Sequence, residues 1–246
     1  MIHVRALAKE YPGGIRALDD VTLDIAPGEF VALIGPSGAG KSSLLRCLNG
    51  LVVPTAGEVI VDGDPVTGAS EDRLRRIRAR VGFVFQQFNL LRRLTVLENV
   101  LVGRLAHTPP WRSLVAWFPA ADVARARGVL GRVGLDGLAD RRADTLSGGQ
   151  QQRVAIARAL VQEPRVLLAD EPMASLDPAL AHTVMELLRR INQEDGITVI
   201  TSLHVIELAL AYGRRIIALR DGHVVHDGGP ESLGQGAAAL IFGRVP

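Results

Sequence analysis

Short apolar runs alternate with helical segments along most of this chain. The runs have the length of buried strands and are bounded by Gly, Pro or charged residues; they occupy residues 30–34, 81–85, 165–169, 197–202 and 215–219. Strands that alternate with helices favour a parallel sheet with βα winding. The pattern therefore predicts an α/β fold.

Two regions depart from this alternation. Apolar positions near the N-terminus predict the strands of an antiparallel edge at residues 2–8, 21–25 and 58–62. Between Gln87 and Ser147 the strand signal is weak, and helices are predicted at residues 95–103, 120–134 and 147–161. A long helix over residues 178–194 follows, with its apolar side chains on one face. We expect a helical lobe inserted into the α/β core.

A glycine-rich loop joins the run at 30–34 to a helical segment at 43–48. The loop reads Gly35-Pro36-Ser37-Gly38-Ala39-Gly40-Lys41-Ser42, which has the spacing of a phosphate-binding P-loop in the strand–loop–helix context that a P-loop needs. Its glycines let backbone N–H groups converge on phosphate oxygens. Lys41 is expected to reach the β- and γ-phosphates and Ser42 to bind Mg²⁺. An ordinary glycine-rich turn is the alternative, which the flanking strand and helix disfavour.

Two carboxylates end a second apolar strand. Residues 165–169 lead directly into Asp170 and Glu171, and Pro172 fixes the direction in which the chain leaves. A strand that ends this way in a P-loop protein is the Walker B arrangement. Asp170 is expected to hold Mg²⁺, and Glu171 to orient the attacking water. A solvated strand end is the alternative.

A second phosphate cradle opens a helix later in the chain. It reads Leu146-Ser147-Gly148-Gly149-Gln150, with Ser147 as a good N-cap before an amphipathic helix. A capped helix alone does not explain two glycines at its start. Helix starts bind anions, and the two cradles cannot serve the same nucleotide from one molecule. We expect a second copy of the chain to complete the active site.

These motifs together resemble those of the ATP-binding subunits of ABC transporters, in which the second cradle is the signature motif. By that resemblance Tyr11 stacks on adenine, Gln86 is the Q-loop glutamine that touches Mg²⁺, Asp177 belongs to the D-loop at the dimer interface, and His204 is the switch histidine near the γ-phosphate. Taken singly, Tyr11 reads equally as a hairpin aromatic, Gln86 as a surface amide and His204 as a helix-start histidine. Their joint order along the chain favours the resemblance.

The resemblance implies a fold, a domain organisation and a set of site residues. The fold would be a P-loop NTPase (RecA-like) core with an antiparallel β subdomain and an inserted α-helical lobe. A single nucleotide-binding domain would span residues 1–246, with the core at 1–86 and 163–246 and the lobe at 87–162. The catalytic residues would be Glu171, His204, Lys41 and Gln86. Mg²⁺ would be bound by Ser42, Gln86 and Asp170. ATP would be bound by residues from both cradles: Tyr11, Gly35, Pro36, Ser37, Gly38, Ala39, Gly40, Lys41, Ser42, Ser43, Ser147, Gly148, Gly149, Gln150 and Asp177.

The implied partners follow from the same resemblance. ATP would hold a homodimer closed, integral-membrane permease subunits would receive the movement, and an external substrate-binding protein would act indirectly. The chain would sit peripherally on the cytoplasmic face of the inner membrane. Three stretches resemble the ATP-binding subunit of bacterial phosphonate importers: residues 103–105 together with 111–114, residues 191–199, and residues 217–224. Other ABC importers or exporters (amino acid, lipoprotein release) and a soluble ABC-type accessory ATPase of a phosphonate-degrading complex are the alternatives.

Composition bounds the remaining possibilities. The formal charge is +2 from 28 basic and 26 acidic residues, which does not argue for nucleic acid. No apolar stretch is long enough to span a bilayer, and no secretory signal is visible. The single cysteine, Cys47, is expected to be a small buried hydrophobe. The arginine-rich run 73–80 suggests a solvated helix face or a contact with lipid or an acidic partner, and Trp111 and Trp117 suggest local packing or an apolar patch for a membrane subunit.

Overall fold

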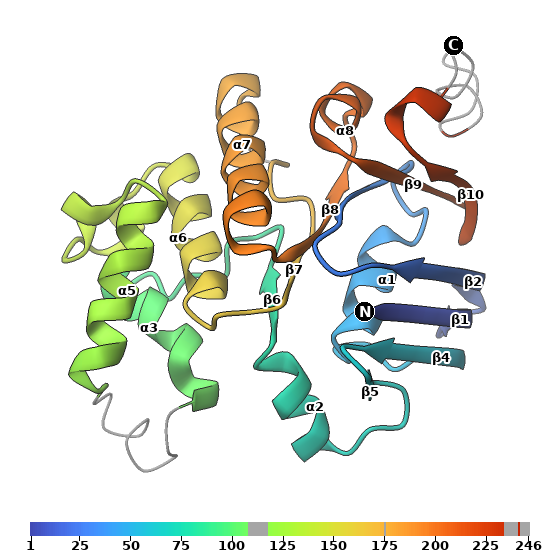
Figure 1. The fold of residues 1–246 in the computed structure, drawn as a ribbon, viewed down its shortest axis with the longest axis horizontal. Coiled ribbons are helices and arrows are strands. Elements are labelled where there is room, and N and C mark those ends of the chain that lie inside the picture. Colours follow the sequence, from blue (N-terminus) through green and yellow to red (C-terminus); the bar gives the residue numbers. More distant parts are fainter. Residues whose placement is uncertain (108–117, 175, 234–240, 242–246) are drawn as a thin grey trace.

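The computed structural model describes residues 1–107, 118–174, 176–233 and 241. Their strands form two sheets (Figure 1). The smaller sheet has the order β2-β1-β4-β5 and is antiparallel throughout. Its strands are β1 (Ile2–Tyr11), β2 (Ile15–Ile25), β4 (Ala56–Val61) and β5 (Asp64–Pro65). The predicted antiparallel edge is therefore confirmed, with longer strands than the sequence indicated.

The larger sheet has the order β10-β9-β3-β8-β7-β6. Its strands are β3 (Phe30–Ile34), β6 (Val81–Val84), β7 (Val166–Ala169), β8 (Thr198–Leu203), β9 (Arg215–Arg220) and β10 (His223–Gly228). All neighbouring pairs run parallel except β9 and β10, which form a hairpin. The predicted α/β class with a parallel sheet is confirmed.

Helices surround the larger sheet and form the lobe. They are α1 (Lys41–Leu48), α2 (Glu71–Arg78), α3 (Val96–Leu101), α5 (Ala120–Arg132), α6 (Gly148–Leu160), α7 (Pro178–Asp195) and α8 (Ile206–Tyr212). Short 3₁₀ turns cover Val102–His107, Asp136–Leu138, Ala143–Thr145 and Pro230–Ser232. In Figure 1, α3, α5 and α6 gather on the side of β6 and β7 away from the antiparallel sheet.

Strand β3 lies between two hydrophobic cores. Phe30, Ala32 and Ile34 belong to the cluster formed with the lobe and α7. Val31 and Leu33 belong to the cluster formed with α1 and the antiparallel sheet. Because alternate side chains of a strand point to opposite faces, a strand covered on both faces is apolar at every position. This explains the continuous apolar run at 30–34.

Several elements differ from their predicted bounds. The predicted helix at 95–103 is α3 followed by a 3₁₀ turn, and at Gly103 a Cβ would lie 2.2 Å from the carbonyl oxygen of Arg158. The sequence missed β5, the short α8 and β10. Strand β10 is a half-exposed edge strand with no buried residue, so it carries no apolar signal. Among the described residues, no helix has both the length and the apolar character needed to cross a membrane.

Candidate functional site

The P-loop connects β3 to α1 and is shaped by close backbone contacts. At Gly35, with φ +149°, a Cβ would lie 2.2 Å from the carbonyl oxygen of Leu219 on the neighbouring strand β9, so only glycine fits. Helix α1 begins at Lys41, after the left-handed Gly40. Lys41 Nζ donates to the carbonyl oxygens of Gly35 at 2.8 Å and Pro36 at 3.0 Å. Burial lowers the pKa of Lys41, and the nearby carboxylates oppose that shift.

Asp170 follows β7 and is almost completely buried beside the start of α1. Ser42 Oγ donates to its Oδ1 at 2.7 Å, and Ser202 Oγ donates to the same oxygen at 3.2 Å. Arg46 Nη2 lies 3.4 Å from its Oδ2. With 1% of its surface exposed, the carboxylate depends on these partners for its stability. The predicted pair of Ser42 and Asp170 therefore lies together at the P-loop.

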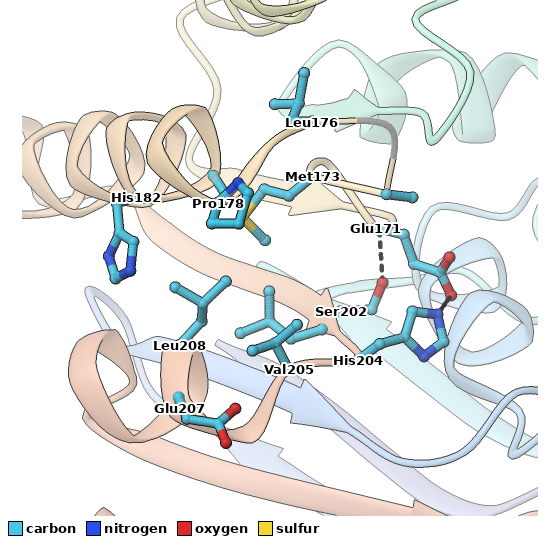
Figure 2. Close-up of a pocket in the computed structure, with 13 residues that line it drawn as sticks. Glu171, Met173, Leu176, Pro178, His182, Ser202, His204, Val205, Glu207 and Leu208 are labelled. Atoms are coloured by element: carbon cyan, nitrogen blue, oxygen red, sulfur yellow. Dashed lines mark hydrogen bonds and ion pairs between the residues drawn. The ribbon is translucent and has the colours of Figure 1, made fainter.

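Glu171 and His204 form an ion pair at the carboxyl ends of β7 and β8 (Figure 2). Glu171 has a left-handed backbone with φ +46°, a strained conformation for a residue other than glycine. Its backbone N–H donates to Ser202 Oγ at 2.8 Å, which holds the turn in place. The Glu171 carboxylate thereby points towards the end of β8 and meets the imidazole.

Both ring nitrogens of His204 have polar neighbours. Lys41 Nζ lies 3.5 Å from Nδ1. On the opposite side of the ring, Nε2 meets the Glu171 carboxylate. Lys41, His204 and Glu171 thus form one chain of polar contacts. The P-loop, the strand-end carboxylates and His204 meet at one site.

The second cradle lies on the exposed start of α6. Ser147 and Gln150 form a capping box: Ser147 N–H donates to Gln150 Oε1 at 3.0 Å, and Gln150 N–H donates to Ser147 Oγ at 3.4 Å. Ser147 and Gly148 are exposed, whereas Gly149 is buried, and a Cβ there would lie 3.1 Å from Leu180 of α7. In the view of Figure 1, β6 and β7 lie between α6 and α1. The structure does not bring the two cradles together.

Three further predicted residues take different positions. The Tyr11 hydroxyl lies 3.2 Å from Ser43 Oγ, and Lys9 Nζ is 5.0 Å from the centre of the Tyr11 ring, so this aromatic lies beside α1. Gln86 is exposed after β6 and lines a cleft that also includes Gln151 of α6. Asp177 caps α7, with its Oδ1 accepting from the backbone N–H of Leu180 at 3.0 Å. Among the described residues, no hydrogen bond joins Gln86 or Asp177 to the P-loop.

Sequence reasoning missed Ser202 and Arg46, which both contact Asp170. Ser202 is the penultimate residue of β8, and the parallel pairing of β7 with β8 carries it beside the carboxylates. A serine at a strand end has no distinctive spacing in the sequence. Only the strand register identifies it.

An apolar cavity of about 250 Å³ lies next to Glu171 and His204, between α7 and α8 (Figure 2). Met173, Leu176 and Leu208 contribute to its wall. The cavity adds an apolar boundary to one side of the polar site. Low polarity there strengthens electrostatic contacts at its edge.

The remaining sequence features are mostly structural. Cys47 is buried, and burial raises its pKa to about 11, so it is an inert thiol at neutral pH. In the arginine-rich run, Arg73, Arg78 and Arg80 form ion pairs with acidic residues of the same chain. These pairs agree with a charged helix face. Trp111 and Trp117 lie outside the described residues.

Comparison with known proteins places this geometry in context. The family model described as ABC transporter matches residues 18–174. Phosphonates import ATP-binding protein PhnC 3 of Halalkalibacterium halodurans is 48% identical over 244 residues, covering 99% of this chain and 95% of that protein. PhnC 2 of Rhodopseudomonas palustris, with the same description, is 53% identical over 226 residues, covering 92% of this chain and 83% of that protein.

Solved structures show the same likeness. The dimeric structure of MJ0796, a bacterial ABC transporter cassette, superposes with a TM-score of 0.83 at 41% identity, covering 94% of this chain and 99% of that one. A dimeric post-hydrolysis state of the same cassette, bound to ADP and Pi, gives a TM-score of 0.81 at 40% identity with the same coverage. The P-loop NTPase cassette fold expected from the sequence is confirmed.

Proposed function

Because this chain belongs to the ABC transporter family, as an ATP-binding and ATP-hydrolysing subunit, we propose that it powers the import of phosphonates or related phosphorus oxyanions. One observation carries the cargo class: 48–53% identity to phosphonates import ATP-binding proteins over 92–99% of this chain. The intact set of Lys41, Ser42, Asp170, Glu171 and His204 supports the ATPase activity.

In the proposed reaction the chain's own groups bind the triphosphate and prepare the water. The backbone N–H groups of the P-loop and the start of α1 cradle the β-phosphate, and Lys41 exchanges its loop carbonyls for phosphate oxygens. Glu171 accepts a hydrogen bond from the attacking water and orients it in line with the γ-phosphate. His204 holds the Glu171 carboxylate and offers a contact to the γ-phosphate. Tyr11 supplies the ring on which adenine stacks.

The residues around Asp170 fit Mg²⁺. A hydroxyl and a carboxylate 2.7 Å apart are hard oxygen donors of the kind that Mg²⁺ prefers. The described part of the chain contains no cluster of three or more His, Cys, Asp or Glu side chains that could hold a metal by themselves. Mg²⁺ in ATPases takes few protein ligands and completes its shell with phosphate oxygens and water. Ser42 and Asp170 would hold it, with Gln86 joining when the lobe moves inward. When bound, the ion neutralises charge on the phosphates.

We propose that the second cradle acts on the nucleotide of a partner copy. Ser147 and Gly148 are exposed on the lobe at the start of α6, where the capping box pairs the N–H groups of Ser147 and Gln150, and the N–H groups of Gly148 and Gly149 have no intrahelical acceptor. Two copies arranged head to tail would place each α6 start, and each D-loop with Asp177, against the other copy's P-loop. ATP then joins the copies, and hydrolysis releases them. A bound ligand drives such a change through its different affinity for the two states.

The same proposal treats the chain as one nucleotide-binding domain that consists of a core and a lobe. A core of residues 1–86 and 163–246 binds nucleotide, while the lobe of residues 87–162 carries the signature motif and moves relative to the core. Permease subunits contact the junction of core and lobe, an external binding protein delivers the cargo, and the chain lies on the cytoplasmic face of the inner membrane. The phosphonates import descriptions of the relatives support this arrangement.

Reconstitution tests the proposed cargo. The chain is assembled in proteoliposomes with its own permease and binding protein, and ATP hydrolysis is measured with methylphosphonate, phosphite, phosphate or an amino acid added on the binding-protein side. We expect a phosphorus oxyanion to raise the rate severalfold, while the amino acid leaves it unchanged. Stimulation by the amino acid alone would contradict the cargo class, and failure of the chain to co-purify with any permease would contradict the transport function.

A further inference from the structure

Arg158, near the end of α6, holds the segment that follows Gln86. Its Nη1 donates to the carbonyl oxygen of Asn89 at 2.6 Å, and its Nη2 donates to that of Phe88 at 2.8 Å. Burial lowers the pKa of Arg158, and within the described residues no carboxylate lies within ion-pair distance of its guanidinium. The two carbonyl groups are therefore the acceptors that stabilise this charge.

The segment held by Arg158 contains one strained residue and an exposed pair of glutamines. Asn89 has a left-handed backbone with φ +50°, a conformation that persists only where neighbouring groups hold it. Phe88 packs its partly buried ring against the core cluster shared with the lobe, whereas Gln86 and Gln87 are exposed. The fork of Arg158 thus fixes the backbone two and three residues beyond Gln86.

The same helix carries the second cradle at its other end. Arg158 follows Gly148 by ten positions within the single 13-residue helix α6, which corresponds to about 15 Å along the axis. Beside Arg158 the helix packs closely on Gly103, where a Cβ would lie 2.2 Å from the Arg158 carbonyl oxygen. The cradle and the two donors of Arg158 therefore belong to one continuous helix.

We propose that Arg158 is a positioning residue that transmits movement of the ATP-facing end of α6 to residues 86–89. This inference rests on the proposed function, in which nucleotide draws Ser147 towards a partner copy. When α6 moves, the carbonyls of Phe88 and Asn89 must follow, because separating them leaves a half-buried guanidinium without acceptors. The exposed segment then reports the nucleotide state to whatever contacts it from the permease.

A fluorescent reporter in the segment tests the inference. Gln87→Cys is introduced into the Glu171→Gln chain and labelled with an environment-sensitive maleimide. Cys47 does not compete, because it is buried and its pKa is raised to about 11. ATP with Mg²⁺ is added, and fluorescence and dimer formation by size-exclusion chromatography are measured on the same sample. We expect Arg158→Met to keep ATP-dependent dimerisation and to lose most of the fluorescence change.

Two variants separate positioning from general damage. Arg158→Lys, which keeps the charge and a donor, is expected to restore part of the signal. Arg153→Met is the matched control, because Arg153 lies on the same helix and donates to the Val133 carbonyl at 3.3 Å, away from the segment; it should leave the signal unchanged. A full fluorescence change in dimeric Arg158→Met overturns the inference. If Arg158→Met does not fold, Arg158→Gln is used in its place. If the Glu171→Gln parent itself forms no dimer with ATP, the proposed function fails instead.

Discussion

At the residue scale, the site depends on a short series of polar contacts. Lys41 meets Nδ1 of His204, and the opposite ring nitrogen meets Glu171. Glu171 is held in a left-handed conformation by the hydroxyl of Ser202, which also donates to Asp170. One serine thus holds the Asp170 carboxylate and the Glu171 backbone, two neighbouring residues with different expected tasks. This arrangement leaves Glu171 as the group placed to act on a water molecule.

Glu171→Gln is expected to separate binding from hydrolysis. The amide keeps the size of the side chain but cannot act as a base, so ATP hydrolysis should fall about 10²–10⁴-fold while ATP binding persists. The variant should accumulate dimers, because the nucleotide that joins the copies is not removed. ATPase assays with sizing in the presence of ATP check both results. A monomeric elution at saturating ATP would contradict the dimer proposal.

At the scale of elements, α6 begins with a helix cap that is exposed at the surface. The capping box of Ser147 and Gln150 satisfies N–H groups of the first turn, and the buried Gly149 lets the helix approach α7. The same exposed serine is proposed to contact a partner's nucleotide. Its structural and functional contributions can therefore be separated by comparison with another capped helix.

Ser147→Ala is expected to reduce both stability and ATP-dependent dimerisation. Loss of the cap should cost about 1 kcal/mol of unfolding free energy, measured by chemical denaturation. Ser70→Ala is the control, since the Ser70 side chain also caps a helix, accepting from the N–H of Arg73 at the start of α2 at 3.4 Å. The control should lose similar stability yet dimerise normally. Both variants are compared in the Glu171→Gln background. If they dimerise equally with ATP, the proposed contact between Ser147 and the partner's nucleotide is contradicted.

At the scale of the whole molecule, one chain is proposed to carry halves of two different ATP sites. The P-loop and the start of α6 lie apart, with β6 and β7 between them in the view of Figure 1. The solved cassette with 41% identity to this chain is dimeric. A closed symmetric dimer would use each half twice, because the same two surfaces meet in both sites.

Mixing two inactive variants tests this shared construction. Lys41→Ala removes the P-loop function, and Ser147→Arg obstructs the second cradle, so neither homodimer should hydrolyse ATP. A mixed dimer has one site built from the intact halves, and an equal mixture should recover up to about a quarter of the wild-type rate if the sites act independently. ATPase titration of one variant with the other measures the recovery. A mixture no more active than its components would contradict two complete, independent sites made from both copies.

The sequence by itself determined the features that depend on neighbours along the chain. The P-loop glycines, the strand that ends in Asp170 and Glu171, and the cap at Ser147 are local, because backbone conformation and helix starts are set by a few adjacent residues. The buried strands of the larger sheet were also readable, since burial on both faces makes them apolar throughout. The edge strand β10 and short α8 carry weaker patterns and were missed.

Only the tertiary structure decided which distant residues meet. Ser202 reaches Asp170 through the register of β7 against β8, and His204 reaches Glu171 at the end of the same pair. Arg158 reaches Phe88 and Asn89, 69–70 positions away in the sequence, because α6 packs beside the end of β6. Such contacts arise from packing between elements, and no spacing along the chain encodes them.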